Sequence, residues 1–153
     1  MEEDKSRLSG TEIDALLMEA QIGYLALARD NQPYLVPLNF IYEKGSIYFH
    51  CALQGRKIDY IRANPKACFQ TGEAGGLING DNPCSHNYSY RSVIVEGRVE
   101  EVVSSVEKEI ILRLITAKYA TTQMAEGEIS AKRVSATGVY RITPSHISGK
   151  RDS

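Results

Sequence analysis

The sequence lacks several features that would point to common classes of site or location. It has no tryptophan, and its three cysteines, Cys51, Cys68 and Cys84, form an odd number without any C-x-x-C spacing. This usage disfavours both a disulfide framework and a structural zinc site. No apolar run approaches the ~20 residues that a membrane-spanning helix needs. A net charge of −1 gives no broad basic surface of the kind that nucleic acid requires.

Familiar catalytic motifs are absent as well. The chain has no nucleophile elbow, Walker loop, dinucleotide-binding glycine fingerprint or metalloprotease motif, and no paired carboxylates typical of a glycosidase. Cys84 and His86 offer only two metal ligands, so we expect no metal site. Any difficult chemistry is therefore expected to come from a bound cofactor. The acidic segment MEEDKSRLSG resembles neither a signal nor a transit peptide, so we expect a cytoplasmic protein.

The sequence has a strand-rich pattern. Its 153 residues suit one domain. Apolar runs separated by short turns predict strands at 22–28, 33–42, 46–52, 66–71, 88–102 and 134–143. Helical spacing, with capping patterns at Thr11–Asp14 and Ser104–Glu107, predicts helices at 9–21, 56–63 and 104–119. Segments 72–87 and 121–130 are expected to be loops. The pattern indicates a mainly β fold, a six-stranded antiparallel barrel with peripheral helices.

Two cations at the start of the second predicted helix form the first candidate site. Arg56 and Lys57 open this helix, and Pro65 ends it. Cations are unfavourable at a helix N-terminus because the macrodipole is positive there, whereas a bound anion is favourable. A forked guanidinium and a compact ammonium together suit a phosphomonoester. The alternative is a solvated surface pair, with Lys57 bonded to Asp59 or Glu43.

Three further groups of residues are candidates for ligand contacts. Pro37 interrupts a strand-like run, so it belongs at an edge or bulge, where free backbone groups of 36–39 either bind a ligand or meet solvent. His50 ends the third predicted strand, and it either faces a ligand or is a satisfied core histidine. Tyr90 and Ser92 share one face of the fifth predicted strand, where tyrosine lines a ligand site or packs half-buried on the sheet.

The order of these features resembles a known family. The ordered pieces VPLNF, IYFHCA, GRK and NPKACF, followed by YRSVIVEGRVEEV and a helix, are similar to the pyridoxamine 5′-phosphate oxidase-like, FMN-binding split-barrel family. They are most similar to its nitroimidazole-resistance (Nim-type) branch. The resemblance extends over roughly residues 11–143. It implies a six-stranded split β-barrel that forms a homodimer, with two FMN sites at the dimer interface.

The resemblance also implies roles for individual residues. Val36, Pro37, Leu38 and Asn39 would run beside the isoalloxazine, with His50 and Cys51 near the ring or the ribityl chain. Arg56 and Lys57 would hold the FMN phosphate. Tyr90 and Ser92 would reach the cofactor from the partner subunit. His50 is the candidate catalytic residue, as a proton donor.

The chain also departs from the true pyridoxamine phosphate oxidases. Its segment ITPSHISGKRDS lacks the Arg-x-His element that those enzymes use for the substrate phosphate. The resemblance therefore favours a flavin-dependent oxidoreductase of a small molecule such as a nitroaromatic compound, with NAD(P)H or a redox partner as electron donor. The alternative is a non-catalytic flavin- or haem-binding module, in which His86 or His146 ligates iron. We expect neither nucleic acid nor membrane as a partner.

Overall fold

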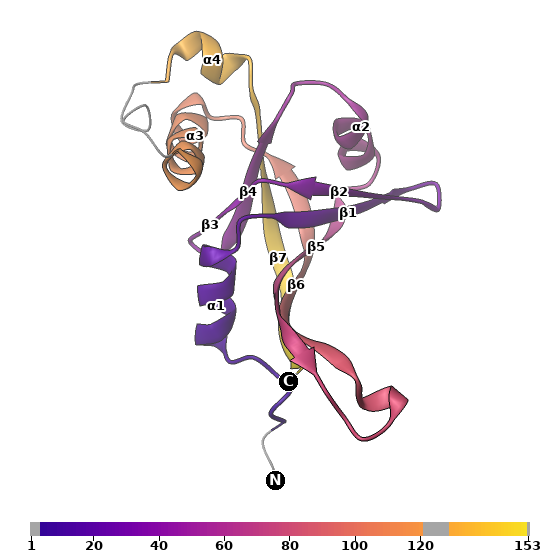
Figure 1. Cartoon of the computed structure of the whole chain (residues 1–153). Helices are drawn as coiled ribbons and strands as arrows, with labels where there is room; N and C mark the ends of the chain where they lie inside the picture. The colour runs from indigo at the N-terminus through magenta and orange to yellow at the C-terminus, as the bar shows by residue number, and fades with distance from the viewer. Residues whose placement is uncertain (1–3, 121–128, 153) are drawn as a thin grey trace.

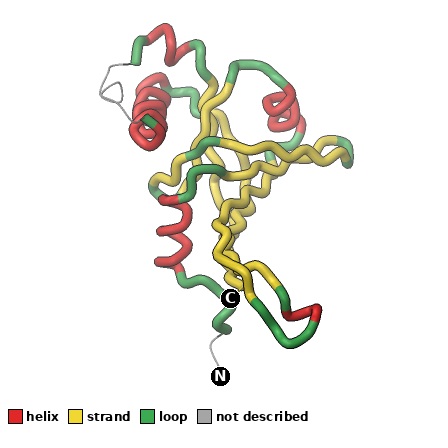
Figure 2. Tube along the Cα trace, in the orientation of Figure 1, coloured by secondary structure: helices red, strands yellow, loops and turns green. Residues whose placement is uncertain are grey.

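The computed structural model describes residues 4–120 and 129–152 and contains one large sheet with helices around it (Figures 1 and 2). Most of the loop predicted at 121–130 lies outside the described residues. The helices are α1 (Gly10–Glu19), α2 (Arg56–Ala63), η1 (Pro83–Ser85), α3 (Ser105–Tyr119) and α4 (Ala131–Ser135). The strands are β1 (Gly23–Arg29), β2 (Gln32–Leu38), β3 (Ile41–Glu43), β4 (Ser46–Cys51), β5 (Lys66–Ile78), β6 (Asn87–Glu101) and β7 (Gly138–Asp152).

The sheet has seven strands in the order β2-β1-β5-β6-β7-β4-β3, and every neighbouring pair is antiparallel. This confirms the predicted mainly β fold with peripheral helices. The predicted strand number of six was wrong, because the single strand expected at 33–42 is divided into β2 and β3. These two strands lie on opposite edges and do not pair within the described residues, so hydrogen bonds do not close the sheet into a barrel.

The short link between the two edge strands determines the curvature of the sheet. Only Asn39 and Phe40 connect the end of β2 with the start of β3. Three peptide steps span at most roughly 11 Å, so Leu38 and Ile41 must lie close together although they belong to opposite edges. A flat seven-stranded sheet would place its edges much farther apart. The sheet therefore curls around its inner face, as a split barrel does.

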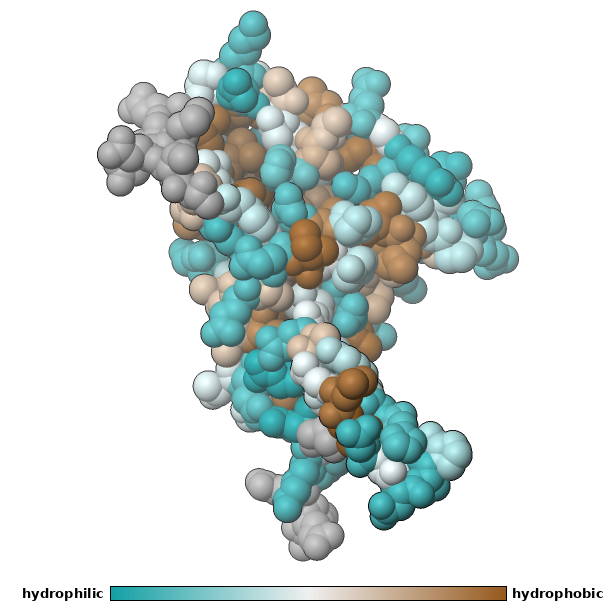
Figure 3. Space-filling view, viewed as in Figure 1, coloured by the Kyte–Doolittle hydropathy of each residue, from teal (hydrophilic) through white to brown (hydrophobic). Residues whose placement is uncertain are grey.

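The main core fills the inner face of this curled sheet. Its largest fully buried side chains include Phe40, Phe49 and Phe69, and α1 adds Leu16 and Leu17. The Phe40 and Phe69 rings meet edge to face, with their centroids 4.8 Å apart, a favourable aromatic geometry. Hydrophobic groups also reach the surface, where Figure 3 shows brown patches among hydrophilic side chains.

A second hydrophobic cluster lies under α3, on the other face of the sheet. It joins Tyr48 and Val139 of the sheet to Ile111, Leu112 and Ile115 of the helix. The alternation of β4 explains the split, because Tyr48 points toward α3 while its neighbours Ile47 and Phe49 enter the main core. The helix α3 is thereby fixed against the β3–β4–β7 side of the sheet.

The strands around the predicted 72–87 loop are longer than the sequence indicated. β5 continues to Ile78 and β6 begins at Asn87, so most of this segment forms a protruding hairpin rather than a loop (Figure 1). The glycines that suggested a loop allow close strand contact instead. A Cβ atom on Gly75 would lie 2.1 Å from the Ser89 hydroxyl, and one on Gly72 would lie 2.5 Å from the Arg91 carbonyl oxygen.

The boundaries of the other elements agree with the sequence to different degrees. The predictions of α2 at 56–63 and of the Ser104 cap on α3 are confirmed. The predicted Thr11 cap was wrong, because Ser9 and Glu12 form the capping box of α1. The strand expected at 134–143 was also misplaced, because Ser130 caps the short helix α4 and β7 runs from Gly138 to Asp152. At the start of α1, both Ser9–Glu12 and Thr11–Asp14 have a serine or threonine followed three residues later by an acid, so the local pattern alone does not identify the N-cap.

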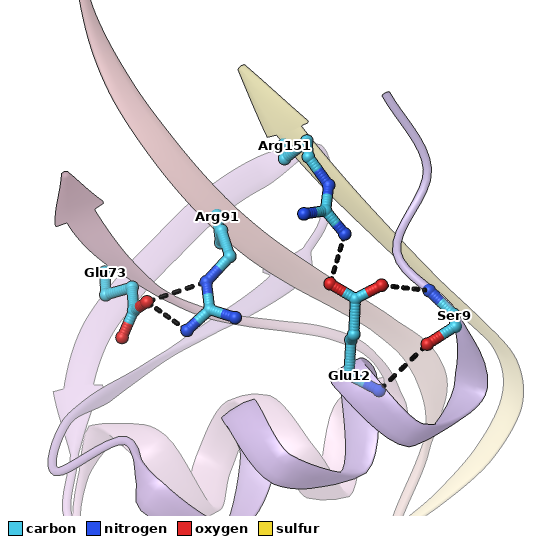
Figure 4. Close-up of polar contacts among 5 residues, drawn as sticks. All are labelled: Ser9, Glu12, Glu73, Arg91 and Arg151. Atoms are coloured by element: carbon cyan, nitrogen blue, oxygen red, sulfur yellow. Dashed lines mark hydrogen bonds and ion pairs between the residues drawn. The ribbon is translucent and has the colours of Figure 1, made fainter. Parts of the chain in front are cut away.

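Ion pairs connect the far ends of the long strands to α1 (Figure 4). Arg91 and Arg151 are direct cross-strand partners on β6 and β7, and two cations side by side would repel each other. Each is neutralised by its own carboxylate, Arg91 by Glu73 of β5 and Arg151 by Glu12 of α1. Glu12 also accepts a hydrogen bond from the Ser9 backbone, so the start of α1 is bound directly to the end of β7.

Replacing Gly23 by alanine should destabilise the fold, because its Cβ atom would lie 2.1 Å from the buried Phe69 ring. We expect a loss of about 1–3 kcal/mol in the free energy of unfolding, measured by chemical denaturation. Gly10→Ala is the matched control, since a Cβ atom there meets nothing within 4 Å, in the first turn of a helix. It should leave stability unchanged or slightly raised. Equal stability of both variants would contradict the packing described here.

Candidate functional site

The candidate site is centred on the N-terminus of α2, which has no side-chain cap. Its N-cap residue Gly55 has a φ of 145°, a conformation that residues with a side chain rarely adopt, and makes no capping hydrogen bond. The first N–H groups of the helix therefore lack the side-chain acceptor that usually satisfies them. Arg56 and Lys57 lie in this same turn. The electrostatic potential at this helix start is therefore positive for two reasons, the helix dipole and the charges of the two side chains.

Arg56 is held by aromatic rings rather than by a carboxylate. Its guanidinium carbon lies 4.5 Å from the centroid of Tyr34 on β2 and 5.6 Å from that of Tyr60 on α2. The two rings are 5.0 Å apart, and Arg29 lies 5.1 Å from the Tyr60 centroid on the same cluster. Cation–π contacts orient a guanidinium without neutralising it, so Arg56 keeps its full charge for an anion.

Lys57 lies between α2 and the end of β4. Its ammonium nitrogen is 5.7 Å from the centroid of the Phe49 ring. The ion pairs suggested as an alternative, with Asp59 or Glu43, do not form among residues 4–120 and 129–152, and neither does one from Arg56. Both cations are therefore available to a ligand.

The positive charge of Lys57 affects the pKa values of His50 and Cys51 at the end of β4. Desolvation by the surrounding protein lowers the pKa of His50 below 6.5, and the positive charge of Lys57 lowers it further. Burial raises the pKa of the Cys51 thiol above 9.0, an effect that Lys57 partly offsets. At neutral pH the site therefore presents a neutral imidazole and a protonated thiol. The raised pKa disfavours Cys51 as a thiolate nucleophile.

The segment Val36–Leu38 forms the end of β2, and Asn39 follows it; β2 is an edge strand, as the presence of Pro37 indicated. β2 pairs with β1 alone, so its other edge carries backbone groups without a ladder partner in the described structure. Val36 is half-buried against the core, Leu38 is buried, and Pro37 and Asn39 are exposed. Tyr34, two residues before Val36 on the same face, contacts Arg56. This contact places the Arg56 guanidinium against the face of β2 that Tyr34 and Val36 share.

Tyr90 and Ser92 are not part of this group within one chain. Both lie on the outer face of β6, where they line a cavity of about 400 Å³ with Tyr24 and Tyr88. On β6, Arg98 pairs with Lys66, which follows α2 in the chain. Tyr90 lies eight residues along β6 from Arg98, a distance of roughly 26 Å in a strand. Within one chain, α2 contacts β2 through Arg56 and Tyr34 and β4 through Lys57 and Phe49, and Tyr90 and Ser92 lie apart from these contacts.

Tyr34 and Tyr60 are site residues that the sequence interpretation missed. Tyr60 follows Arg56 by four residues on α2, the spacing at which helix side chains contact each other. That spacing was a usable signal for Tyr60. The position of Tyr34 depends on how β2 lies against α2, which no local pattern specifies.

The two histidines considered as haem ligands lie elsewhere. His86 follows η1 at the tip of the β5–β6 hairpin and is exposed. His146 is exposed on β7 and lines a cavity of about 580 Å³ together with Arg7 and Lys150. No group of three or more metal-ligating side chains occurs among the described residues. None of the helices described has the length and apolar content needed to cross a bilayer.

The sequence profile of the pyridoxamine 5′-phosphate oxidase family matches residues 9–151, and the chain belongs to this family. An uncharacterized protein of Rhizobium meliloti, RA0666, is 30% identical over 95 residues. That match covers 62% of this chain and 56% of the relative, so it spans little more than half of the relative's length.

Solved structures share the whole fold. An FAD-binding protein from Mesorhizobium loti has 27% identity and a TM-score of 0.69, over 96% of this chain and 97% of its own. A candidate 5-nitroimidazole antibiotic resistance protein from Bacteroides thetaiotaomicron has 23% identity and a TM-score of 0.79, over 96% and 90%. An FAD- and haem-binding protein from Mycobacterium smegmatis has 19% identity and a TM-score of 0.86, over 95% and 73%.

The pKa of His50 provides a direct test of this geometry. In the wild type, NMR titration of the imidazole should give a pKa below 6.5, since desolvation and Lys57 both disfavour the imidazolium. Lys57→Met should raise this pKa toward 6.5 without reaching it, because desolvation, the larger cause, remains. Lys57→Arg keeps the charge and should keep the low pKa.

The same shift predicts a pH dependence of stability. Below pH 6.5 the unfolded chain binds more protons at His50 than the folded chain does, so acidification should cost stability at this group. Lys57→Met should reduce that cost. An unchanged His50 pKa in Lys57→Met would show that the ammonium does not act on the imidazole.

Proposed function

We propose that this protein is a cytoplasmic flavoprotein that binds FMN, with the FMN phosphate at the N-terminus of α2. The observation that carries the proposal is the combination of an uncapped helix start at Gly55 with two cations, Arg56 and Lys57, that no carboxylate of residues 4–120 or 129–152 neutralises. A phosphate dianion satisfies the free N–H groups and relieves the repulsion between the cations and the helix dipole. The three cysteines are free, which suits a reducing compartment.

The free edge of β2 is the proposed contact for the isoalloxazine ring. Backbone groups of Val36–Asn39 would bond the polar edge of the ring, and the amide of Asn39 would add one donor and one acceptor. Tyr34 and Arg56 connect this edge to the proposed phosphate position, so one cofactor can reach both. FAD-binding relatives with the same fold support a flavin.

We also propose that the protein acts as a homodimer with two flavin sites at the interface. The outer face of the sheet carries exposed hydrophobic side chains that a second copy would cover: Tyr24, Leu35, Tyr88, Tyr90 and Ile94. Tyr24, Gln70 and Ile94 form one row across three strands, so the patch is continuous across β1, β5 and β6. In this arrangement Tyr90 and Ser92 would approach the flavin held by the partner subunit.

The proposed activity is reduction of a small oxidised molecule such as a nitroaromatic compound. A bound flavin supplies the redox chemistry, accepting electrons from NAD(P)H or a redox partner and passing them to the substrate. The chain binds and orients the reactants, and His50 delivers a proton from its imidazolium form. The structural relative described as a candidate nitroimidazole resistance protein supports this choice of substrate class.

Flavin retention is the first test of the proposal. Purified protein, mixed with FMN and desalted, should retain the flavin absorption bands and bind FMN at least tenfold more tightly than riboflavin, which lacks the phosphate. Arg56→Ala/Lys57→Ala should weaken FMN binding about 100-fold or more, because two charge-assisted contacts are lost, and should bring the two affinities close together. Arg62→Ala/Lys66→Ala, in the last turn of α2 and at the start of β5, removes two exposed cations away from the helix start; it is the matched control and should retain FMN.

The outcomes of this experiment are distinct. FMN that is retained by the wild type and lost by Arg56→Ala/Lys57→Ala would support the phosphate position. Flavin binding that is indifferent to the phosphate would refute that position. A Soret band with haem in place of the flavin bands would favour the haem-binding alternative.

Catalysis by His50 predicts a particular pH profile. FMN-loaded protein, given NADPH or dithionite without oxygen, should consume a 5-nitroimidazole, and His50→Ala should slow this step about 100-fold, the lower end of the range for general acid catalysis. Since the pKa of His50 lies below 6.5, its contribution should grow as the pH falls through that value. His50→Ala, compared at saturating FMN, should flatten this rise. Equal rates in both proteins at every pH would exclude His50 as the proton donor.

A further inference from the structure

The last turn of α3 is bonded to two segments that are remote in sequence. The Lys118 ammonium donates hydrogen bonds to the carbonyl oxygens of Ala20, at 2.7 Å, and Phe40, at 2.8 Å. It also lies 4.0 Å from the centroid of the Phe40 ring. Ala20 is the C-cap of α1, where a cation is favourable because free carbonyl groups and the negative end of the helix dipole meet there.

Tyr119 completes the same contact from the next position. Its hydroxyl accepts a hydrogen bond from the Phe40 N–H at 2.9 Å. The hydroxyl oxygen is also 2.8 Å from the Gln21 carbonyl oxygen and 3.0 Å from that of Phe40, so its single proton donates to either one. Lys118 and Tyr119 together thus bond both backbone groups of Phe40. We refer to these two residues as the α3 clamp.

The segment held by the clamp is the crossing between the two edges of the sheet. Phe40 lies between β2 and β3, so neither strand ladder satisfies its backbone N–H and C=O. Unsatisfied buried backbone groups are costly, and Phe40 is fully buried. The side chains of Lys118 and Tyr119 supply the missing partners, and this determines where the chain leaves β2. The end of β2, Val36–Asn39, is directly attached to that point.

We propose that Lys118 and Tyr119 are positioning residues that hold Val36–Asn39 in the orientation required to contact the flavin ring. This inference rests on the proposed function and assigns a role to residues that do not touch the cofactor themselves. Half-burial is consistent with a constrained ammonium, since desolvation lowers the pKa of Lys118 to about 8. The clamp acts on the ring end of the cofactor, whereas Arg56 and Lys57 act on its phosphate.

FMN and riboflavin, used as paired probes, separate the effect of the α3 clamp on the ring end from the effect of Arg56 and Lys57 on the phosphate. Lys118→Met, which keeps the length of the side chain and removes its charge, should weaken the binding of both flavins by the same factor, about tenfold. The ratio of the two affinities should therefore stay at its wild-type value. Arg56→Ala/Lys57→Ala should instead collapse that ratio. Tyr119→Phe should act as Lys118→Met does, with a smaller effect.

A spectroscopic signature separates positioning from loss of folding. After the spectrum of free FMN is subtracted, only folded, loaded protein contributes, so a shift of the bound flavin bands in Lys118→Met reports a changed environment of the ring. Lys118→Arg retains a cation that can reach the two carbonyl groups, and it should restore the spectrum and most of the affinity. Lys108→Met, on the same helix and outside these contacts, is the matched control and should resemble the wild type.

Each outcome decides the inference. Weaker binding of both flavins at a constant ratio, with a shifted spectrum, would support the positioning role. A wild-type spectrum and wild-type affinities in folded Lys118→Met would overturn it while leaving the proposed function intact. A wild type that binds no flavin would refute the proposed function itself, and the positioning role with it. If Lys118→Met does not fold, Tyr119→Phe gives the same comparison with a smaller change.

Discussion

The architecture depends on the two-residue crossing at Asn39–Phe40. Because so short a link joins the opposite edges of a seven-stranded sheet, the sheet must curl, and its inner face then encloses the aromatic core. The crossing leaves the backbone of Phe40 without strand partners, and α3 supplies them through Lys118 and Tyr119. The position of α3, the curvature of the sheet and the free edge of β2 are therefore parts of one arrangement.

The candidate site contains backbone groups and charges that the described structure leaves without bonding partners. The uncapped start of α2 is linked to β2 by the contact of Arg56 with Tyr34, and to β4 by the approach of Lys57 to Phe49. Folding stability alone would favour a capped helix and neutralised cations at such a place. The described part of the chain provides neither here, and local costs of this kind are typical of binding sites, where a ligand supplies the missing partner.

Much of the site was predictable because its signals are local. The cations of α2, the boundary at Pro65 and the edge position of Pro37 each follow from a few neighbouring residues, and the described structure agrees with all three, although the β1–β2 ladder continues unbroken through Pro37. The glycine-rich part of β5 was not predictable in this way. Glycine at 72 and 75 indicates a loop by local rules, whereas the facing strand requires it because any larger residue would collide with β6.

The sequence by itself determined the mainly β class, the helix α2 and the candidate anion site, because these depend on periodicity and on neighbours within one or two turns. Only the tertiary structure decided that residues 33–42 divide between opposite edges of one sheet. It also decided that Lys118 contacts Ala20 and Phe40, at separations of 98 and 78 residues. Those contacts exist only after the sheet has curled and α3 has packed against it, so no local pattern carries them.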